Sequence, residues 1–189
     1  MSLLPAVFLD RDGTLIEDVG YLNHLDRVQF FPWSVDAVRV LNHAGLHVVV
    51  LTNQAGVAQG YHDEAFVAKT HDMIAAFVRN GGGRIDAFYY CPHLPDARVE
   101  RYRVKCECRK PAPGMILAAA RDLGLDLARS FVVGDRWRDV ALGRATGAKS
   151  ILVRTGHGLS EEISPQDGLA ADCVADNLMA AAAWILRNR

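Results

Sequence analysis

Acidic, hydroxyl and basic side chains follow short apolar runs in this 189-residue sequence, and they could carry phosphoryl-transfer chemistry. Asp10 could attack phosphorus and form an acyl phosphate. Asp12, two residues later, could protonate the leaving oxygen and then activate water. The hydroxyl of Thr52 and the ammonium of Lys110 could hold the equatorial phosphate oxygens. The sequence therefore predicts a catalytic set made of these four residues.

This chemistry requires a divalent cation, because two carboxylates cannot approach a phosphate dianion unaided. Asp10, Asp135 and the backbone carbonyl of Asp12, with waters, would form the all-oxygen shell that Mg²⁺ prefers. An Asp-x-Asp pair or a Gly-Asp turn is common in solvated loops, so neither is informative alone. Their shared position after apolar runs favours the catalytic interpretation.

The cysteines give a second candidate site. One residue separates Cys91 from His93, and one residue separates Cys106 from Cys108. Three thiolates and one imidazole form a complete tetrahedral set for a structural Zn²⁺. The alternative is a chance group of buried cysteines, which the paired spacing and the polar loop between the pairs disfavour. We expect a zinc loop over about residues 91–109.

Apolar segments alternate with amphipathic ones along the chain, which indicates strands and helices in turn. The predicted strands span residues 6–10, 46–51, 85–91, 131–134, 149–153 and 172–174. The predicted helices span residues 33–44, 113–123, 137–146 and 177–187, with one more between an Asp63 cap and Gly81. That helix is expected to turn towards the core Phe66, Met73, Ile74, Phe77 and Val78.

The alternation predicts an α/β fold, a Rossmann-like open parallel sheet with helices on both faces. We expect one domain over residues 1–189. In such sheets, ligands bind beyond the carboxyl ends of the strands. Because the chemistry-bearing residues follow the predicted strands or the irregular loop, they should converge on this one rim.

Composition argues against several other classes. The net charge is −1, and no dense Lys/Arg cluster indicates a nucleic-acid partner. No apolar run reaches the roughly 18 residues of a membrane span, and the first residues do not resemble a signal peptide. We expect a cytoplasmic monomer without nucleic-acid or membrane partners, whose thiols stay free of disulfides.

Four motifs then indicate a family. DRDGT at 10–14, TNQ at 52–54, RKP at 109–111 and GDRWRD at 134–139 resemble, in this order, the motifs of the haloacid dehalogenase-like (HAD) phosphatase superfamily. The resemblance implies the roles above, with Asp139 as an auxiliary acidic residue. Larger members carry a cap domain after the first motif or before the lysine. No long insertion other than the zinc loop occurs at either place here, so no cap domain is expected.

The loop sequence CPHLPDARVERYRVKCECRKPAPGM is similar to that of HAD phosphatases that act on D-glycero-D-manno-heptose 1,7-bisphosphate. This resemblance implies hydrolysis of the 7-phosphate to the 1-phosphate through an aspartyl phosphate, on the route to the ADP-heptose of lipopolysaccharide core. It also implies that the sugar bisphosphate contacts a flap between residues 12 and 33, the segment after Thr52, and two arginines. The implied substrate-binding residues are Asp18, Val19, Gly20, Tyr21, Asn53, Gln54, Ala55, Arg109 and Arg136.

Other functions fit parts of the pattern. A phosphatase of histidinol phosphate or of another small phosphomonoester would share the chemistry, but the histidinol-phosphate enzymes have a shorter stretch than residues 93–106. A phosphoacceptor signalling domain also combines Asp, Thr and Lys at strand ends, but its phosphorylated Asp would end a middle strand. A zinc-dependent interaction module would leave the catalytic set unexplained.

Overall fold

The computed structural model describes residues 3–189 and contains a six-stranded sheet in the order β3-β2-β1-β4-β5-β6. All neighbouring strands in it are parallel. The strands are β1 (Ala6–Leu9), β2 (His47–Asn53), β3 (Ala87–Cys91), β4 (Phe131–Gly134), β5 (Lys149–Val153) and β6 (Cys173–Ala175). The predicted open parallel sheet is therefore confirmed.

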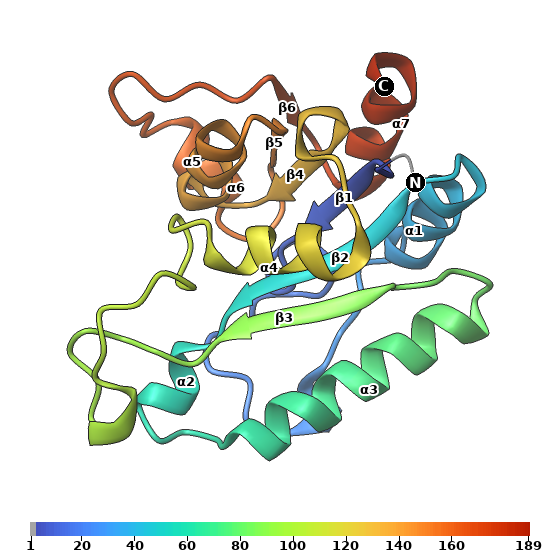
Figure 1. Cartoon of the computed structure of the whole chain (residues 1–189). Helices are drawn as coiled ribbons and strands as arrows, with labels where there is room; N and C mark the ends of the chain where they lie inside the picture. Colours follow the sequence, from blue (N-terminus) through green and yellow to red (C-terminus); the bar gives the residue numbers. More distant parts are fainter. Residues whose placement is uncertain (1–2) are drawn as a thin grey trace.

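The central strands are short apolar runs because both of their faces are buried. Val7 and Leu9 of β1 face the larger core, whereas Ala6 and Phe8 face the smaller one. The helices cover both faces of the sheet (Figure 1). The larger core lies under α1 (Ser34–His43), α3 (Glu64–Asn80) and α7 (Leu178–Asn188), and the smaller one under α4 (Gly114–Leu123) and α5 (Trp137–Thr146).

Helix α3 begins after Asp63 as predicted, and the Asp63 side chain accepts the N–H of Phe66 at 2.7 Å. Its buried face includes Ile74 and Val78, which lie one turn apart. Phe77 was expected on this face, but it is 48% exposed and stacks on Phe30. That prediction is wrong because Phe77 lies at the edge of the apolar stripe, on the same side of the helix as the partly buried Phe66 and Met73.

Strand β2 runs two residues past its predicted end, because Thr52 and Asn53 pair with Tyr90 and Cys91 of β3. Two short helices, α2 (Ala55–Ala58) and α6 (Gly158–Glu162), were not predicted. Each is shorter than two turns, so it leaves no amphipathic period to recognise.

The strands end at one edge of the sheet, and the arrowheads of β1, β2 and β3 in Figure 1 point towards α2 and the zinc loop. The flap joins β1 to α1, and the zinc loop joins β3 to α4. Within residues 3–189, these two connections hold only the single 3₁₀ turns η1 (Leu25–Arg27) and η2 (Glu100–Tyr102), so neither contains a cap domain; a third turn, η3 (Leu127–Arg129), precedes β4. None of the described helices is long and apolar enough to cross a bilayer.

Candidate active site

Asp10 directly follows β1, and its carboxylate is buried against Lys110. The Lys110 ammonium lies 2.9 Å from Oδ1 of Asp10 and 2.7 Å from Oδ1 of Asp139, and it donates to the carbonyl of Leu51 at 2.7 Å. Burial alone would lower the pKa of Lys110, but the charges of Asp10 and Asp139 outweigh burial and raise it. Lys110 is therefore a fixed cation beside the predicted nucleophile.

Asp135 follows β4 and forms a cluster with Asp10 and Asp139, in which the ligand oxygens lie within 4.8 Å of one another. Burial, followed by the charge of Asp10, raises the pKa of Asp135 to about 8. Oδ2 of Asp135 accepts the N–H of His157 at 2.8 Å, whereas its Oδ1 is buried without a partner among the described residues. This donor set is all oxygen, and Lys110 offsets only part of its negative charge. Both features fit a Mg²⁺ site.

Two glycines pack directly against the Asp135 carboxylate. A Cβ on Gly13 or on Gly156 would lie 2.3 Å from Oδ2 of Asp135. Their φ angles of 80° and 56° also lie in the left-handed region. Glycine at both positions therefore lets the backbone approach the carboxylate this closely.

We expect Gly156→Ala to weaken Mg²⁺ binding about tenfold or more, because the added methyl displaces Asp135. Gly147→Ala is the matched control, since Gly147 has a φ of 75° but a Cβ there would meet nothing within 4 Å. Gly147→Ala should lose roughly 1 kcal/mol of stability through backbone strain, and Gly156→Ala should lose more, because its Cβ would also lie 2.6 Å from Cα of Gly13. Calorimetric titration with Mg²⁺ separates them, and equal affinities would argue against Asp135 as a ligand.

Asp12 is held apart from the cluster by neighbouring polar groups. Arg11 Nε lies 3.1 Å and Gln54 Nε2 3.0 Å from its Oδ2, and the Thr52 hydroxyl lies 3.5 Å from the same oxygen. The side chain of Asp12 is 21% exposed, whereas that of Asp10 is 3% exposed. The more accessible carboxylate suits proton exchange with substrate and water.

A hollow of about 100 Å³ opens at Asp12. The residues predicted to bind substrate that line it are Asp18, Gly20, Tyr21, Asn53, Gln54 and Ala55. Val19 differs from them, because its side chain packs against the larger core and its carbonyl accepts a hydrogen bond from Arg27 at 3.0 Å. The side chain of Val19 therefore points away from the hollow in this structure, and its contact with substrate stays a prediction.

Five residues that line the same hollow were missed by sequence reasoning, and three of them carry charged or titratable groups, Arg11, His62 and Arg138; the other two are Leu22 and Gly56. Burial opposes the charge of Arg138, but the nearby carboxylates, Asp10 first among them, raise its pKa. Arg11 and Arg138 both lie inside the recognised motifs, so the motifs offered a signal for them. His62 lies outside every motif.

The four predicted zinc ligands come together. Sγ of Cys91 lies 3.5 Å from that of Cys106 and 2.9 Å from that of Cys108, and Nδ1 of His93 lies 3.3 Å from Sγ of Cys108. In a tetrahedral site with Zn–S bonds of about 2.3 Å, sulfur atoms lie about 3.8 Å apart. Burial, followed by the neighbouring Cys108 thiol, raises the pKa of the Cys91 thiol. The donor set fits Zn²⁺, and binding of the ion would move the sulfurs apart to that spacing.

The chain at the end of the zinc loop is tied to β2 at Lys110, the lysine predicted to be catalytic. Asn53 Nδ2 donates to the carbonyl of Lys110 at 3.1 Å, and the N–H of Lys110 donates to Oδ1 of Asn53 at 3.0 Å. Cys108 lies only two residues before Lys110. An ion in the sulfur site would therefore help to fix the backbone that carries the lysine.

Two predicted substrate-binding arginines make other contacts. Arg109 donates to the carbonyl of His93 at 3.1 Å, and burial lowers its pKa. Arg136 Nη1 lies 3.4 Å from Oε1 of Glu161. Neither arginine lines the hollow at Asp12, so their contact with substrate stays a prediction.

The HAD-hydrolase-like family matches residues 107–181. Two curated relatives are named D-glycero-beta-D-manno-heptose-1,7-bisphosphate 7-phosphatase. The relative from Photorhabdus laumondii is 40% identical over 176 residues, which cover 92% of this chain and 93% of the relative. The relative from Escherichia coli strain K12 is 41% identical over 177 residues, which cover 93% and 90%.

The chain belongs to the heptose-bisphosphate phosphatase family.

Solved structures of the heptose-bisphosphate phosphatase family share the fold. The D,D-heptose 1,7-bisphosphate phosphatase from B. bronchiseptica, complexed with magnesium and phosphate, is 34% identical with a TM-score of 0.87 and covers 98% of this chain and 100% of its own. The enzyme from Burkholderia thailandensis is 32% identical with a TM-score of 0.71 and covers 96% and 98%. The predicted HAD-like fold is confirmed, and the enzyme class is phosphomonoester hydrolase.

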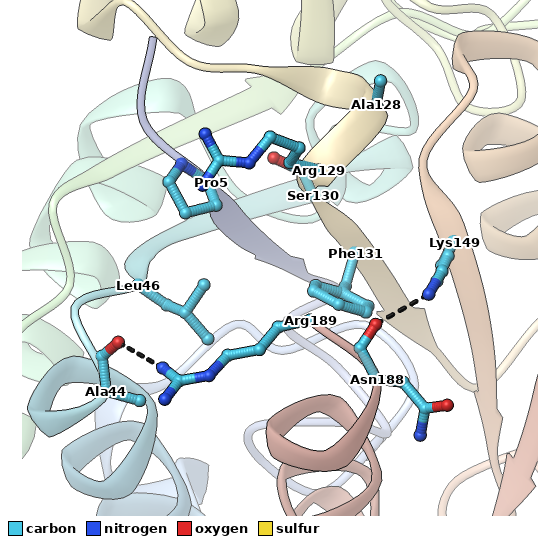
Figure 2. Close-up of a pocket in the computed structure, with 10 residues that line it drawn as sticks. All are labelled: Pro5, Ala44, Leu46, Ala128, Arg129, Ser130, Phe131, Lys149, Asn188 and Arg189. Carbon is cyan, nitrogen blue, oxygen red and sulfur yellow. Dashed lines mark hydrogen bonds between the residues drawn. The ribbon is translucent and has the colours of Figure 1, made fainter. Parts of the chain in front are cut away.

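A larger hollow, of about 420 Å³, lies at the opposite edge of the sheet, where Pro5 precedes β1 (Figure 2). Two of its basic side chains donate to main-chain carbonyls, Lys149 to that of Asn188 at 2.7 Å and Arg189 to that of Ala44 at 2.6 Å. It contains neither the carboxylate cluster nor the thiols. In this member of the heptose-bisphosphate phosphatase family, size alone therefore does not identify the reaction site.

Proposed function

We propose that this protein hydrolyses the 7-phosphate of D-glycero-D-manno-heptose 1,7-bisphosphate and leaves the 1-phosphate. The carrying observation is Asp10, buried 2.9 Å from the Lys110 ammonium at the carboxyl edge of the sheet, in a chain about 40% identical to enzymes named for this reaction. The product would then serve the synthesis of the ADP-heptose used in lipopolysaccharide core.

The reaction proceeds in two displacements at phosphorus. Asp10 attacks the 7-phosphate, and the sugar oxygen leaves with a proton from Asp12. Asp12 then removes a proton from water, which attacks the aspartyl phosphate, releases inorganic phosphate and restores Asp10. Lys110 stays 2.9 Å from the nucleophile and offsets charge that gathers on the phosphate oxygens, with the Thr52 hydroxyl beside it.

Both metals have a defined place in this proposal. Asp10, Asp135 and the backbone carbonyl of Asp12 would hold Mg²⁺, which would supply positive charge against the phosphate dianion. Cys91, His93, Cys106 and Cys108 would supply Zn²⁺ with four protein ligands, which is the complete set of a structural site. The zinc site is therefore structural, and the enzyme depends on Mg²⁺ for turnover.

Steady-state kinetics with Mg²⁺ test the substrate. We expect kcat/KM for the heptose 1,7-bisphosphate to exceed that for histidinol phosphate by about 100-fold or more. The sugar hydroxyls and the second phosphate would bond to polar groups of the protein, and histidinol phosphate would leave those groups unpaired. Both anomers of the bisphosphate are compared, since the anomeric preference is open. Equal or higher kcat/KM with histidinol phosphate would reject the proposed substrate in favour of the alternative one.

Several sequence predictions accompany this proposal unchanged. They are a single domain over residues 1–189, action as a cytoplasmic monomer, and the absence of nucleic-acid and membrane partners. The sugar bisphosphate is the proposed small-molecule partner, and Arg109 remains the proposed residue that recognises its second phosphate or its hydroxyls.

A further inference from the structure

One residue in the loop after β5 contacts both the metal cluster and the flap. The N–H of His157 donates to Oδ2 of Asp135 at 2.8 Å, and its Nε2 lies 3.1 Å from Oδ2 of Asp18. Oδ1 of Asp18 in turn accepts the N–H of Gly20 at 2.8 Å. Because Asp18 and Gly20 line the hollow at Asp12, the imidazole of His157 bonds to a wall of the reaction site.

The backbone that carries His157 is tightly held without help from its side chain. The Thr155 hydroxyl donates to the carbonyl of Gly13 at 2.6 Å, and Gly156 packs against the Asp135 carboxylate. A Cβ on Gly158 would lie 1.7 Å from the carbonyl oxygen of Val153, so the chain is equally crowded on the other side. The backbone therefore fixes the position from which the imidazole contacts the flap.

Residues 18–21 of the flap make few polar contacts with the rest of the protein, although Val19 packs against the larger core. Arg27 donates to the carbonyls of Val19 and Tyr21, but Arg27 belongs to the flap itself. The ring of Tyr21 stacks on Tyr61, with centroids 4.3 Å apart, and both rings are exposed. Among the described residues, His157 gives this segment its hydrogen bond to a side chain outside the flap.

We propose that His157 is a positioning residue, which through Asp18 holds residues 18–21 at a fixed distance from the carboxylate cluster. This inference rests on the proposed function, because a substrate that spans the cluster and the flap needs that distance set before it binds. The side chain of His157 does not touch the cluster, and its N–H remains in any non-proline variant. Its loss should therefore weaken substrate binding and leave phosphoryl transfer almost unchanged.

Kinetics of His157→Ala test this division. We expect KM for the heptose bisphosphate to rise about 3- to 10-fold, the range of one net hydrogen bond, with kcat within about twofold of wild type. His157→Gln, whose amide nitrogen can reach the place of Nε2, should recover most of the loss. His24→Ala is the matched control, because His24 is an exposed histidine of the same flap whose side chain makes no cap bond.

A double-mutant cycle tests whether Asp18 mediates the effect. Asp18→Ala should raise KM by at least as much as His157→Ala, and the combined variant should be no worse than Asp18→Ala alone. Additive losses would overturn the inference. So would a fall in kcat at unchanged KM in His157→Ala, since that pattern would place the effect on Asp135.

Hydrogen exchange separates this inference from the choice of substrate. In His157→Ala, the peptide covering residues 17–22 should exchange several-fold faster than in wild type and in His24→Ala, with no ligand present. If wild-type protein fails to hydrolyse the heptose bisphosphate, the proposed function fails while this measurement still tests the contact. Unchanged exchange in residues 17–22 would overturn the positioning role itself.

Discussion

Asp10→Asn should lower kcat by on the order of 10⁴-fold or more, the scale seen when a catalytic nucleophile is removed. The amide cannot form the acyl phosphate, although it nearly matches the carboxylate in shape. The melting temperature should stay within a few degrees of wild type, because the substitution also removes one of three crowded carboxylates. Initial rates with the heptose bisphosphate, together with a thermal melt, check both parts.

The matched control for this experiment is Asp167→Asn, which makes the same chemical change at an exposed loop position. It should retain wild-type kcat. Residual activity above about one per cent in Asp10→Asn, at wild-type stability, would argue that another group or water attacks phosphorus directly. Phosphorylated protein in acid-quenched Asp10→Asn samples would lead to the same conclusion.

Cys108→Ser should release the metal of the zinc loop and lower kcat/KM about tenfold or more. Structural zinc contributes folding free energy directly, so its loss frees the loop that it closes. Lys110 lies two residues after Cys108. Its backbone would then be fixed only by the two hydrogen bonds to Asn53, because the loop before it would be disordered. Metal analysis measures the loss of the ion, limited proteolysis between residues 92 and 109 measures the disorder of the loop, and kinetics measure the fall in kcat/KM.

Cys173→Ser is the control for that experiment. Cys173 is the one cysteine of the sequence outside the cluster, and it packs partly buried against the larger core. It should keep a full equivalent of zinc, a protease-resistant loop and wild-type kcat/KM. A Cys108→Ser protein without metal whose loop still resists protease would show that the loop does not depend on the ion.

The parts of the site that follow strands could be predicted from the sequence. Asp10 and Asp135 each come directly after a buried apolar run, and parallel strands bring such ends to one edge. The Cys91 and Cys106 pairs could also be predicted to meet, because the four ligands complete one tetrahedral set. In both cases the residue types are local in the sequence, and a general rule, for parallel sheets or for zinc coordination, predicts that they meet.

Contacts that depend on packing between distant segments could not be predicted in this way. The bond between Asp18 and His157 spans 139 positions, and no periodicity connects the two residues. His71 is similar: it stacks on Phe88 in the interior, where burial, followed by the charge of Arg11, lowers its pKa to about 3. Its place beside Arg11 could not be predicted, because hydrophobic patterns do not show which distant polar groups share a buried space.

The two proposed ion sites differ in chemical softness, one all oxygen and the other mostly sulfur. Contaminating metals should therefore divide between them: Cd²⁺ or Cu⁺ would compete at the thiolates, and Ca²⁺ or Mn²⁺ at the carboxylates. Poisoning by a soft metal would distort the loop ahead of Lys110 and resist rescue by excess Mg²⁺. Inhibition by a hard metal would be relieved by dilution into magnesium buffer. Recovery of activity under these two treatments would therefore show which site the contaminating metal occupies.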